Sequence, residues 1–260
     1  MSTVYQLFNE NSNFDVHIIR QLDTLVLEYD LLFVYIVGVK TERLNKLEDF
    51  LSKTDRATKT HFELASFSDE ILMKEIIEKV VHYSDSLGMN EQELPNLVSI
   101  LTTGQIELIS DSKPRIATVL DQMRTVYNLL KVTKEVKSRR KLTRLHVHTL
   151  AYQAILTTKG SNWKNTMSAA AKASLTANRH TCGSNYIDTH KAKLLMDDSF
   201  SKTATQEFAD KIALEEDRPV SCWSEDDFDI CLAPVLVCTE VLQTGGGGDN
   251  ISSAGLLYQI

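Results

Sequence analysis

The sequence predicts an α/β fold in one domain over residues 1–260, with a mostly parallel sheet flanked by helices. Stretches rich in β-branched and aromatic residues alternate with stretches whose apolar residues recur at helical spacing, as in βαβ units. Hydrophobic residues make up 43% of the chain and charged residues 24%, which is ordinary for a globular domain. We find no internal repeat, low-complexity segment or linker in the sequence that would divide it.

The first half of the chain supplies alternating strands and helices. Residues 1–29 show no pattern that we can interpret. Residues 30–39 form a continuous apolar run, Asp-Leu-Leu-Phe-Val-Tyr-Ile-Val-Gly-Val, which predicts a strand buried on both faces. The elements expected next are a helix over 41–53, a short strand over 60–66, and a second amphipathic helix from Ser68 to about Gly88.

The second half continues the alternation and ends in a helix. We expect a helix over 114–136, a strand over 143–150, an alanine-rich helix over 163–178, and strands over 219–223 and 228–238. The last two are most simply a β-hairpin. A final helix follows a run of glycines near the C-terminus.

Charge and cysteine content exclude several functional classes. The net charge of -7 argues against nucleic acid as the main partner, and we interpret the basic run over 131–141 as a solvated helix end and loop. The four cysteines, Cys182, Cys222, Cys231 and Cys238, form no C-x-x-C pair and predict free thiols in a reducing compartment. The residues after Met1 do not resemble a signal peptide, and no apolar run approaches the roughly 18 residues of a membrane span. We therefore expect a cytoplasmic protein.

Polar residues at the predicted strand ends are the first candidates for a site, because ligands of open α/β sheets bind beyond the carboxyl ends of the strands. In the strand over 60–66, the period of two places His61 and Glu63 on one face. His146 and His148 alternate in the same way along the strand over 143–150. The alternative for both pairs is a set of polar side chains that are satisfied by hydrogen bonds inside the protein.

Asn90 and Glu93 have the spacing of a helix capping box. With Asn90 as N-cap, however, Pro95 would occupy the fifth helical position and remove an N–H donor that the helix needs. A helix that starts nearer Pro95 leaves Asn90 and Glu93 in the preceding loop, available for another role. Loop carboxylates beside a phosphate site would suit Mg²⁺, which prefers oxygen ligands.

The glycine run over 245–248 precedes Asp249 and the final helix. Its backbone N–H groups and the electropositive helix start would bind a phosphoryl group, and Asp249 would accept a proton from a hydroxyl. The alternative is a flexible linker with Asp249 as the N-cap of the helix. The sequence has neither the P-loop pattern G-x-x-x-x-G-K-[ST] nor the hydrolase pattern G-x-S-x-G.

Five short stretches occur together in a characteristic order. They are His-Phe-Glu-Leu-Ala-Ser at 61–66, Leu-Gly-Met-Asn-Glu-Gln-Glu-Leu at 87–94, Thr-Arg-Leu-His-Val-His-Thr-Leu at 143–150, Pro-Val-Leu-Val-Cys at 234–238 and Gly-Gly-Gly-Asp at 246–249. From about residue 30 to its end, the sequence resembles the C-terminal half of the ADP-dependent glucokinases, especially their animal branch, in the ribokinase-like superfamily. The family signatures H-x-E, N-x-x-E and G-x-G-D are all present.

The resemblance implies transfer of the terminal phosphoryl group of ADP to glucose, which yields glucose 6-phosphate and AMP. By position in the motifs, Asp249 resembles the catalytic base. The other implied roles are anion-hole N–H groups for Gly246, Gly247 and Gly248, Mg²⁺ organisation for Glu63, Glu93 and Asp249, and motif partners for His61 and Asn90. These groups suit phosphoryl transfer, which depends on positioning and on neutralising charge.

The resemblance also carries expectations that go beyond the site residues. The N-terminal strands and the sugar-gripping lid of a complete family member are expected to be missing, and the chain is expected to be a monomer. Animal relatives belong to the endoplasmic reticulum or the secretory pathway. Gly245 and Gly247 stand where the family usually has hydrophobic residues, and each added glycine raises the cost of ordering the loop by roughly 0.5–1 kcal/mol. The alternative function is that of a catalytically impaired relative, which binds nucleotide or a partner without phosphorylating sugar.

Overall fold

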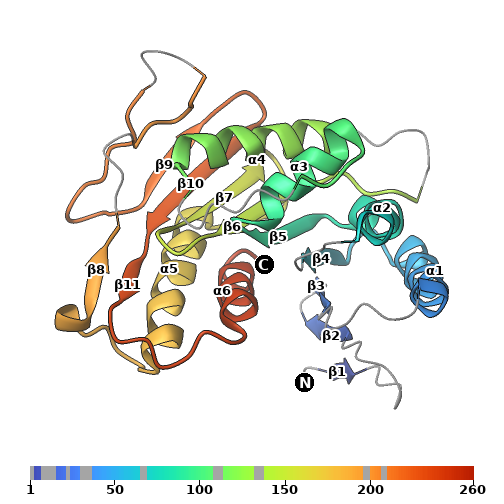
Figure 1. Cartoon of the computed structure of the whole chain (residues 1–260), viewed down its shortest axis with the longest axis horizontal. Helices are drawn as coiled ribbons and strands as arrows, with labels where there is room; N and C mark the ends of the chain where they lie inside the picture. The colour runs from blue at the N-terminus through green and yellow to red at the C-terminus, as the bar shows by residue number, and fades with distance from the viewer. Residues whose placement is uncertain are drawn as a thin grey trace. The chain divides into compact units, whose positions relative to one another are not determined.

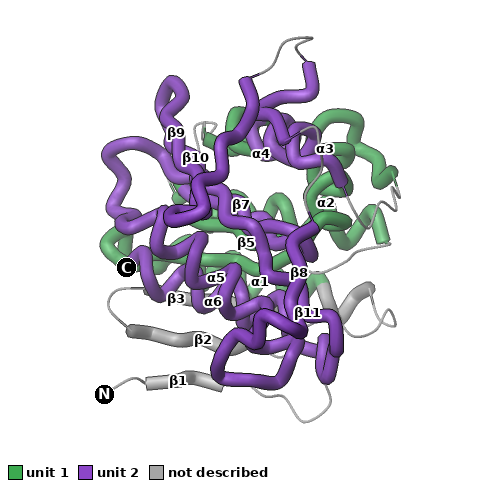
Figure 2. Tube along the Cα trace, turned by 90° about the vertical axis from the view of Figure 1, so that its left-hand side faces the viewer, with its two compact units in different colours: residues 1–109, 125–143 green, residues 110–124, 144–260 purple. Residues whose placement is uncertain are grey.

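The computed structural model describes residues 3–6, 16–21, 24–29, 37–64, 69–107, 114–131, 138–195, 200–205 and 210–260, with side chains from residue 41 onward. The chain divides into two compact units (Figure 2). Unit 1 comprises residues 1–109 and 125–143, and unit 2 comprises residues 110–124 and 144–260. Each unit is described by itself, and the single domain expected over 1–260 stays a prediction.

The sheet of unit 1 combines antiparallel and parallel pairing. Its strands lie in the order β1 (Thr3–Gln6), β2 (Val16–Gln21), β3 (Thr24–Tyr29), β4 (Lys59–Glu63) and β5 (Ser86–Asn90). The first three pair antiparallel, whereas β3, β4 and β5 pair parallel. The expected strand–helix–strand alternation and its parallel pairing are therefore found in this unit.

The helices of unit 1 agree with the apolar spacing in their interiors and differ at their ends. The helices are α1 (Val37–Lys53), α2 (Glu70–Lys79) and α3 (Glu93–Thr103). In α2 the Asp69 carboxylate caps the first turn by accepting from the Leu72 N–H at 3.0 Å, and the apolar side chains of one face are buried. Ser68, where we expected this helix to begin, lies outside the described residues.

Two expectations for unit 1 were wrong. Residues 37–39, the end of the predicted strand over 30–39, form the first turn of α1, and residues 30–36 lie outside the described part. A short apolar run does not distinguish a buried strand from a buried helix. The predicted helix toward Gly88 ends at Lys79, and residues 86–90 form β5. This strand, Ser-Leu-Gly-Met-Asn, lacks the β-branched residues that mark strands in a sequence.

Unit 2 is built on an antiparallel sheet covered by helices. The strand order is β6 (Arg144–His148), β7 (Tyr152–Thr158), β10 (Phe228–Pro234) and β9 (Ser221–Ser224). The helices α5 (Thr166–Cys182) and α6 (Gly247–Leu257) lie side by side, and α5 packs on β7 and β10 through buried alanines (Figure 1). The expected strand over 143–150, the β9–β10 hairpin and the final helix are confirmed, whereas β7 was missed.

Two further elements complete the chain. Helix α4 (Ile116–Leu130) was expected, and its first part belongs to unit 2 while its last part belongs to unit 1. Strand β8 (Ala192–Leu194) pairs antiparallel with β11 (Leu236–Cys238) in a small second sheet. The predicted strand over 228–238 is therefore two strands that serve different sheets.

The expectation of four free thiols was wrong, because the structure pairs all four cysteines. Cys222 and Cys231 lie directly opposite each other on β9 and β10, with their Cα atoms 4.1 Å apart. Cys182 at the end of α5 is bonded to Cys238 at the end of β11. Strand pairing brings these residues together, and a linear sequence does not show it. The pairing removes our argument for a reducing compartment, so the cytoplasmic location stays a prediction.

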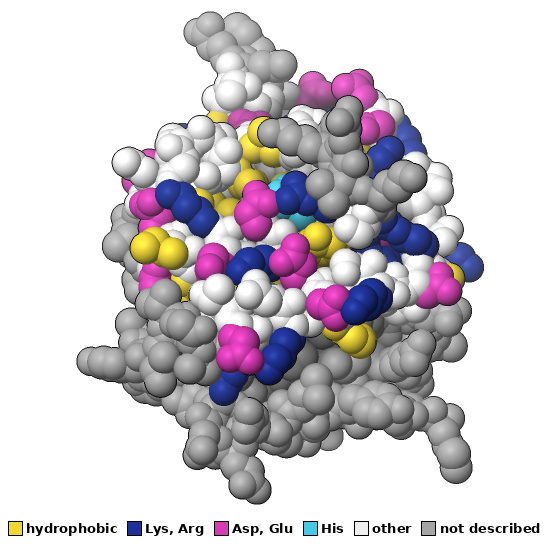
Figure 3. Space-filling model, turned by 90° about the vertical axis from the view of Figure 1, so that its right-hand side faces the viewer, with side chains coloured by type: hydrophobic (Ala, Val, Ile, Leu, Met, Phe, Trp, Pro, Cys, Tyr) yellow, Lys and Arg dark blue, Asp and Glu magenta, His cyan; other side chains and the backbone are white. Residues whose placement is uncertain are grey.

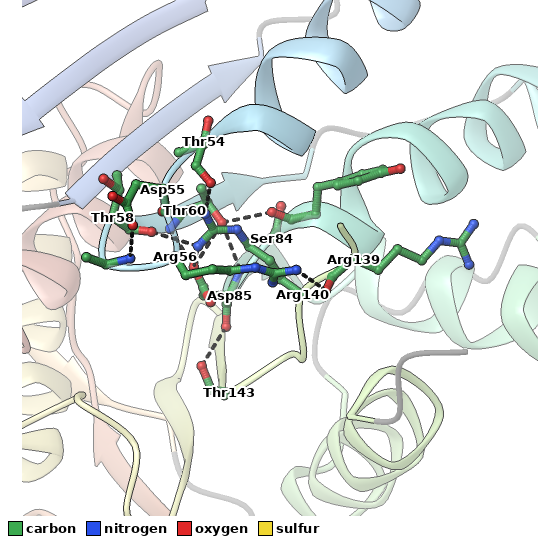
Figure 4. A network of polar contacts seen from close by, with 12 residues as sticks. Thr54, Asp55, Arg56, Thr58, Thr60, Ser84, Asp85, Arg139, Arg140 and Thr143 are labelled. Carbon is green, nitrogen blue, oxygen red and sulfur yellow. Dashed lines mark hydrogen bonds and ion pairs between the residues drawn. The ribbon is translucent and has the colours of Figure 1, made fainter. Parts of the chain in front are cut away.

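The basic run over 131–141 is not simply a solvated loop, because Arg140 is buried in unit 1 (Figure 4). Its Nη1 donates to Asp85 Oδ2 and to the Thr58 carbonyl, each at 2.7 Å. Its Nη2 donates to the carbonyls of Thr54 and Asp55 at 3.1 and 2.8 Å. A single guanidinium thus ties the segment after α4 to the loop before β4 and to the residue before β5.

The Asp85 carboxylate completes this network. Its Oδ2 also accepts from the Thr60 N–H at 2.9 Å, and the Asp85 carbonyl accepts from the Thr143 N–H at 2.8 Å. Arg139, the neighbour of Arg140, pairs instead with Glu78, whose side chain is 59% exposed. The two adjacent arginines therefore occupy very different environments.

The face of the molecule in Figure 3 shows acidic and basic side chains interspersed where it is described. On the exposed helix faces of unit 1, charges of opposite sign pair one turn apart, as in Glu42–Lys46 and Glu70–Lys74. Such pairs are typical of solvated helices. Among the described residues, no helix is long and apolar enough to cross a membrane.

Candidate active site

The carboxyl end of β4 holds the first predicted pair, His61 and Glu63. Both are buried on one face of the strand, as the period of two predicted, and His61 Nε2 lies 3.2 Å from Glu63 Oε2. The opposite ring nitrogen, Nδ1, lies 2.9 Å from the Ser86 hydroxyl. Because an ionised carboxylate only accepts, the simplest assignment puts the proton on Nε2 and makes Nδ1 the acceptor of the Ser86 O–H. The ring thereby fixes one oxygen of Glu63.

Asn90 and Glu93 form the capping box that Pro95 seemed to exclude. The Asn90 Oδ1 accepts from the backbone N–H groups of Gln92 and Glu93 at 2.8 and 2.9 Å. In return, Glu93 accepts from the backbone N–H and the Nδ2 of Asn90 at 2.8 and 2.9 Å. The expectation that both residues lie in the loop before the helix was therefore wrong, because Asn90 ends β5 and Glu93 begins α3. The regular helix does begin near Pro95, at Glu93. The box joins this first helical residue to Asn90, in the turn that leads into the helix.

The polar residues of unit 1 lie at matching ends of two neighbouring strands. Glu63 is opposite Gly88 in the parallel β4–β5 register, and Asn90 ends β5 two residues farther along. Carboxylate oxygens are the ligands that Mg²⁺ takes, and Mg²⁺ often binds only one or two of them, together with waters and substrate phosphates. Two carboxylates fit that pattern. No group of three or more His, Cys, Asp or Glu residues with metal-binding geometry occurs among the described residues.

The glycine run of unit 2 forms the start of α6 and is not a linker. Gly246 is the N-cap residue, in the left-handed conformation at φ 69°, and the helix proper begins at Gly247. Asp249 lies in the first turn, so its alternative role as N-cap was wrong. The Gly247 N–H donates to the Thr244 carbonyl at 3.1 Å, and the Asn250 N–H donates to the Gly246 carbonyl at 3.2 Å. Asp249 therefore stands where the helix dipole favours a negative charge.

The four glycines of the run are not equivalent. Gly246 needs a glycine because its φ is positive, and a Cβ on Gly248 would lie 3.0 Å from Cε1 of His148. A Cβ on Gly245 would meet nothing within 4 Å, and one on Gly247 would make only ordinary contact, 3.5 Å from His180. The structure thus favours glycine at the two glycine positions of G-x-G-D, by a positive φ at 246 and by a tight contact with a side chain at 248. The added glycines, at 245 and 247, stand where a side chain fits.

Two histidines adjoin this run, and the sequence identified only one of them as a candidate. His148 is the last residue of β6, and its ring lies against Gly248. It is thus at a strand end, where candidate site residues were expected. Its predicted companion His146 is fully buried and contacts Gln153 Oε1 through Nε2 at 3.1 Å, so it is a core residue that is hydrogen-bonded through this nitrogen. His180, in the last turn of α5, was missed because nothing in an alanine-rich helix indicates a contact 65 residues away.

A cavity of about 450 Å³ opens beside the last turn of α5. The segment from Cys182 to Tyr186 lines one part of it, with Asp188 and Lys191 nearby. A hydrogen bond and ion pair with Glu240 raise the pKa of Lys191, which keeps this side chain cationic. The backbone of the same region holds the chain that leads to the glycine run, since the Thr239 N–H donates to the Lys191 carbonyl at 2.8 Å.

The predicted site residues fall into two groups, one in each unit. His61, Glu63, Asn90 and Glu93 belong to unit 1, whereas Gly246, Gly247, Gly248 and Asp249 belong to unit 2. Within its unit, each group is brought together by hydrogen bonds or by continuous chain. The assignment of metal, anion-hole and base roles to these residues stays a prediction.

Comparison with known proteins identifies relatives over most of the chain. The conserved region of ADP-specific phosphofructokinases and glucokinases matches residues 34–258. An ADP-dependent glucokinase of Bos taurus is 32% identical over 220 residues, which cover 84% of this chain and 43% of that protein. A probable ADP-dependent glucokinase of Caenorhabditis elegans is 29% identical over 231 residues, covering 85% and 45%. The chain spans less than half the length of these relatives.

Solved structures agree on the fold. An ADP-dependent kinase in complex with fructose-6-phosphate and ADPβS matches with a TM-score of 0.58 at 18% identity, over 91% of this chain and 53% of that one. A reconstructed last common ancestor of ADP-dependent phosphofructokinases from Methanosarcinales matches with a TM-score of 0.57 at 18% identity, over 91% and 50%. The expected ribokinase-like α/β class is thereby confirmed.

Proposed function

Because the chain belongs to the family of ADP-specific phosphofructokinases and glucokinases, we propose that it transfers the terminal phosphoryl group of ADP to glucose. The products are glucose 6-phosphate and AMP. Glucose is favoured over fructose 6-phosphate as acceptor because the relatives matched over most of this chain carry the name glucokinase. The observation that carries the proposal is the start of α6, where a glycine with positive φ and a glycine packed closely against His148 occupy the motif positions and a carboxylate follows directly.

The residues of unit 2 would carry out the transfer itself. The Asp249 carboxylate takes the proton of the attacking sugar hydroxyl, so that the oxygen attacks phosphorus while the bond to the AMP oxygen breaks. The N–H groups of Gly246 and Gly248 at the start of α6 hold the charge that spreads over the phosphoryl oxygens, whereas the Gly247 N–H already donates to the Thr244 carbonyl. Neither step needs a covalent enzyme intermediate. Positioning and charge neutralisation carry most of the catalysis.

Glu63 and Glu93 are the residues of unit 1 that would hold Mg²⁺, directly or through water. When bound, Mg²⁺ neutralises charge on the transferred phosphoryl group. His61 holds one oxygen of Glu63, and Asn90 contacts both oxygens of Glu93, so each carboxylate is oriented by a neighbour.

The nucleoside part of ADP is assigned to the cavity beside α5. Its volume of about 450 Å³ falls in the range of small-molecule sites. Tyr186 is 69% exposed at its edge and offers an aromatic face for stacking on a base, and Lys191 offers a cation for a phosphate. The cavity and the glycine run belong to the same unit. The segment that leads from β11 to the run is hydrogen-bonded to Lys191, which lines the cavity.

The test is Mg²⁺-dependent production of AMP from ADP and glucose by the purified chain, compared with Asp249→Asn. Loss of a general base lowers the rate by roughly 10²–10⁴-fold, so the variant is expected to be nearly inactive while its fold is unchanged. Asp226→Asn, at an acidic residue of the same unit, serves as the matched control. Equal product from wild type and Asp249→Asn would refute catalysis by this chain. Faster turnover with fructose 6-phosphate would refute the choice of glucose.

A further inference from the structure

We infer that His180 is a positioning residue, which holds the glycine run in the conformation that binds the phosphates of the nucleotide. The inference rests on the proposed function for its ligand, and on the structure of unit 2 for its mechanism. His180 lies in the last turn of α5, whereas the run lies 65 residues later at the start of α6.

The run has no capping side chain of its own. At Gly246 the N-cap position provides no side chain that accepts a hydrogen bond from the first turn. Helices that begin this way depend on other groups to fix the entering chain. Here the last turn of α5 supplies them. The Thr181 carbonyl accepts from the N–H groups of Leu242 and Gln243 at 2.8 and 3.4 Å, and His180 contacts the next part of the run.

The hydrogen-bond partners of His180 indicate which of its ring nitrogens donates and which accepts. Nε2 lies 2.9 Å from the Gly245 carbonyl, which can only accept, so Nε2 carries the proton. Nδ1 is then the acceptor, and it lies 3.3 and 3.4 Å from the amide nitrogens of Gln243 and Asn250. The Asn250 amide nitrogen also donates to the Gly246 carbonyl at 2.9 Å, which fixes its orientation. One ring therefore joins the residues before, within and after the run.

The ring also packs against the turn that it holds. Its Cδ2 lies 3.5 Å from the place of a Cβ on Gly247, the first residue of α6. On the other side of the motif, His148 closes the space next to Gly248. The N–H groups that would bind a phosphoryl group are thus set from two sides, by packing from His148 and by hydrogen bonds from His180. His180 contacts the flexible glycines through polar groups that a substitution can remove and restore.

The experiment measures the run first without any ligand. Amide hydrogen exchange is followed at residues 242–250 in wild type, His180→Ala, His180→Gln and the control His190→Ala, at an exposed histidine of the same unit. Losing a hydrogen bond or two predicts exchange roughly fivefold to tenfold faster in His180→Ala. His180→Gln, which restores a donor to the Gly245 carbonyl, and His190→Ala are expected to stay close to wild type. If the alanine variant does not fold, His180→Leu replaces it.

The second measurement is calorimetric binding of Mg²⁺–ADP and of adenosine. His180→Ala is expected to weaken ADP binding roughly fivefold to tenfold and to leave adenosine binding unchanged, because only the phosphates contact the run. Exchange at 242–250 that matches wild type overturns the positioning role, as does an equal acceleration throughout unit 2. Equal losses for ADP and adenosine overturn it too. If wild type binds no nucleotide, the proposed function fails, and the exchange data still decide the role of His180.

Discussion

The Arg140 network of unit 1 and the glycine run of unit 2 are both polar, yet they are built in opposite ways. Arg140 is 3% exposed, and its guanidinium is satisfied by one carboxylate and three backbone carbonyls. Residues 243–246, which lead into the glycine run, are exposed. Their contacts come from backbone groups, side-chain amides and the His180 ring, at distances of up to 3.4 Å. The first region joins elements at the amino ends of β4 and β5, whereas the second starts a helix.

The difference separates stability from function. A buried and fully satisfied ion pair keeps one geometry, because breaking it leaves a charge without a partner in the interior. A site that binds and releases phosphate needs accessible backbone groups and tolerates weaker restraints. We therefore expect substitutions in the Arg140 network to change the free energy of unfolding, and substitutions near the glycine run to change binding at smaller cost to stability.

Arg140→Ala should have the largest effect. Removing one partner of a buried ion pair costs roughly 3–5 kcal/mol of unfolding free energy, because Asp85 stays buried without its cation. Urea denaturation measures this change. The neighbouring Arg139→Ala is the matched control, since its partner Glu78 is largely exposed and such pairs contribute about 1 kcal/mol or less. Similar losses for the two variants would contradict the contrast between the regions.

Cys238→Ser tests whether a covalent bond compensates for the weak contacts around the run. The Cys182–Cys238 bond joins residues 56 apart, and the chain-entropy relation predicts roughly 4 kcal/mol of stabilisation for such a loop. Urea denaturation of the oxidised protein and the variant measures the loss. Cys222→Ser opens a loop of only 9 residues and is expected to lose about 3 kcal/mol. No loss for Cys238→Ser would show that other contacts hold this end of α5.

The glycines of the run should respond differently to alanine. Gly248→Ala places a Cβ against His148 and is expected to cost about 1–3 kcal/mol and to abolish ADP binding. Gly245→Ala meets no atom within 4 Å and is expected to be neutral or to stabilise by roughly 0.4–1 kcal/mol, because the unfolded chain becomes less free. Thermal unfolding and calorimetric ADP titration of both variants measure this. Equal effects of the two variants on stability and on ADP binding would mean that position 248 accepts a side chain as readily as position 245.

The smallest expected effect is a pH dependence in unit 2. Burial alone would raise the pKa of Glu225, but hydrogen bonds and charge attraction from Arg124, with a hydrogen bond from Trp223, lower it below its ordinary value of 4.5. Its contribution to stability is therefore complete above the unfolded pKa and is lost as pH falls through the lower folded value. Unfolding midpoints between about pH 6 and about pH 3 should drop less steeply in Glu225→Gln than in wild type. Equal slopes would show that other carboxylates dominate.

Much of the fold was predictable because the helices show their buried face in the spacing of apolar residues. The helices expected over 41–53, 114–136 and 163–178 follow from that pattern and are found as α1, α4 and α5. The β9–β10 hairpin was expected from its two strand-like stretches. The strand β5 was not, because Ser-Leu-Gly-Met-Asn has no strand preference and is held by its parallel pairing with β4. The cysteine pairs were also missed, since strand register places Cys222 opposite Cys231.

The candidate site was predictable where its chemistry lies in short motifs. The sequence by itself marked His61, Glu63, Asn90, Glu93 and the glycine run with Asp249 as candidates, because together they form the ordered motifs through which the chain resembles its family. Tertiary structure alone shows that Asn90 and Glu93 form a capping box, that a side chain would be strained at 246 and tightly packed at 248, and that His180 is hydrogen-bonded to the run. The reason is physical: a motif is local in the chain, whereas these contacts depend on which distant side chain packing places beside it.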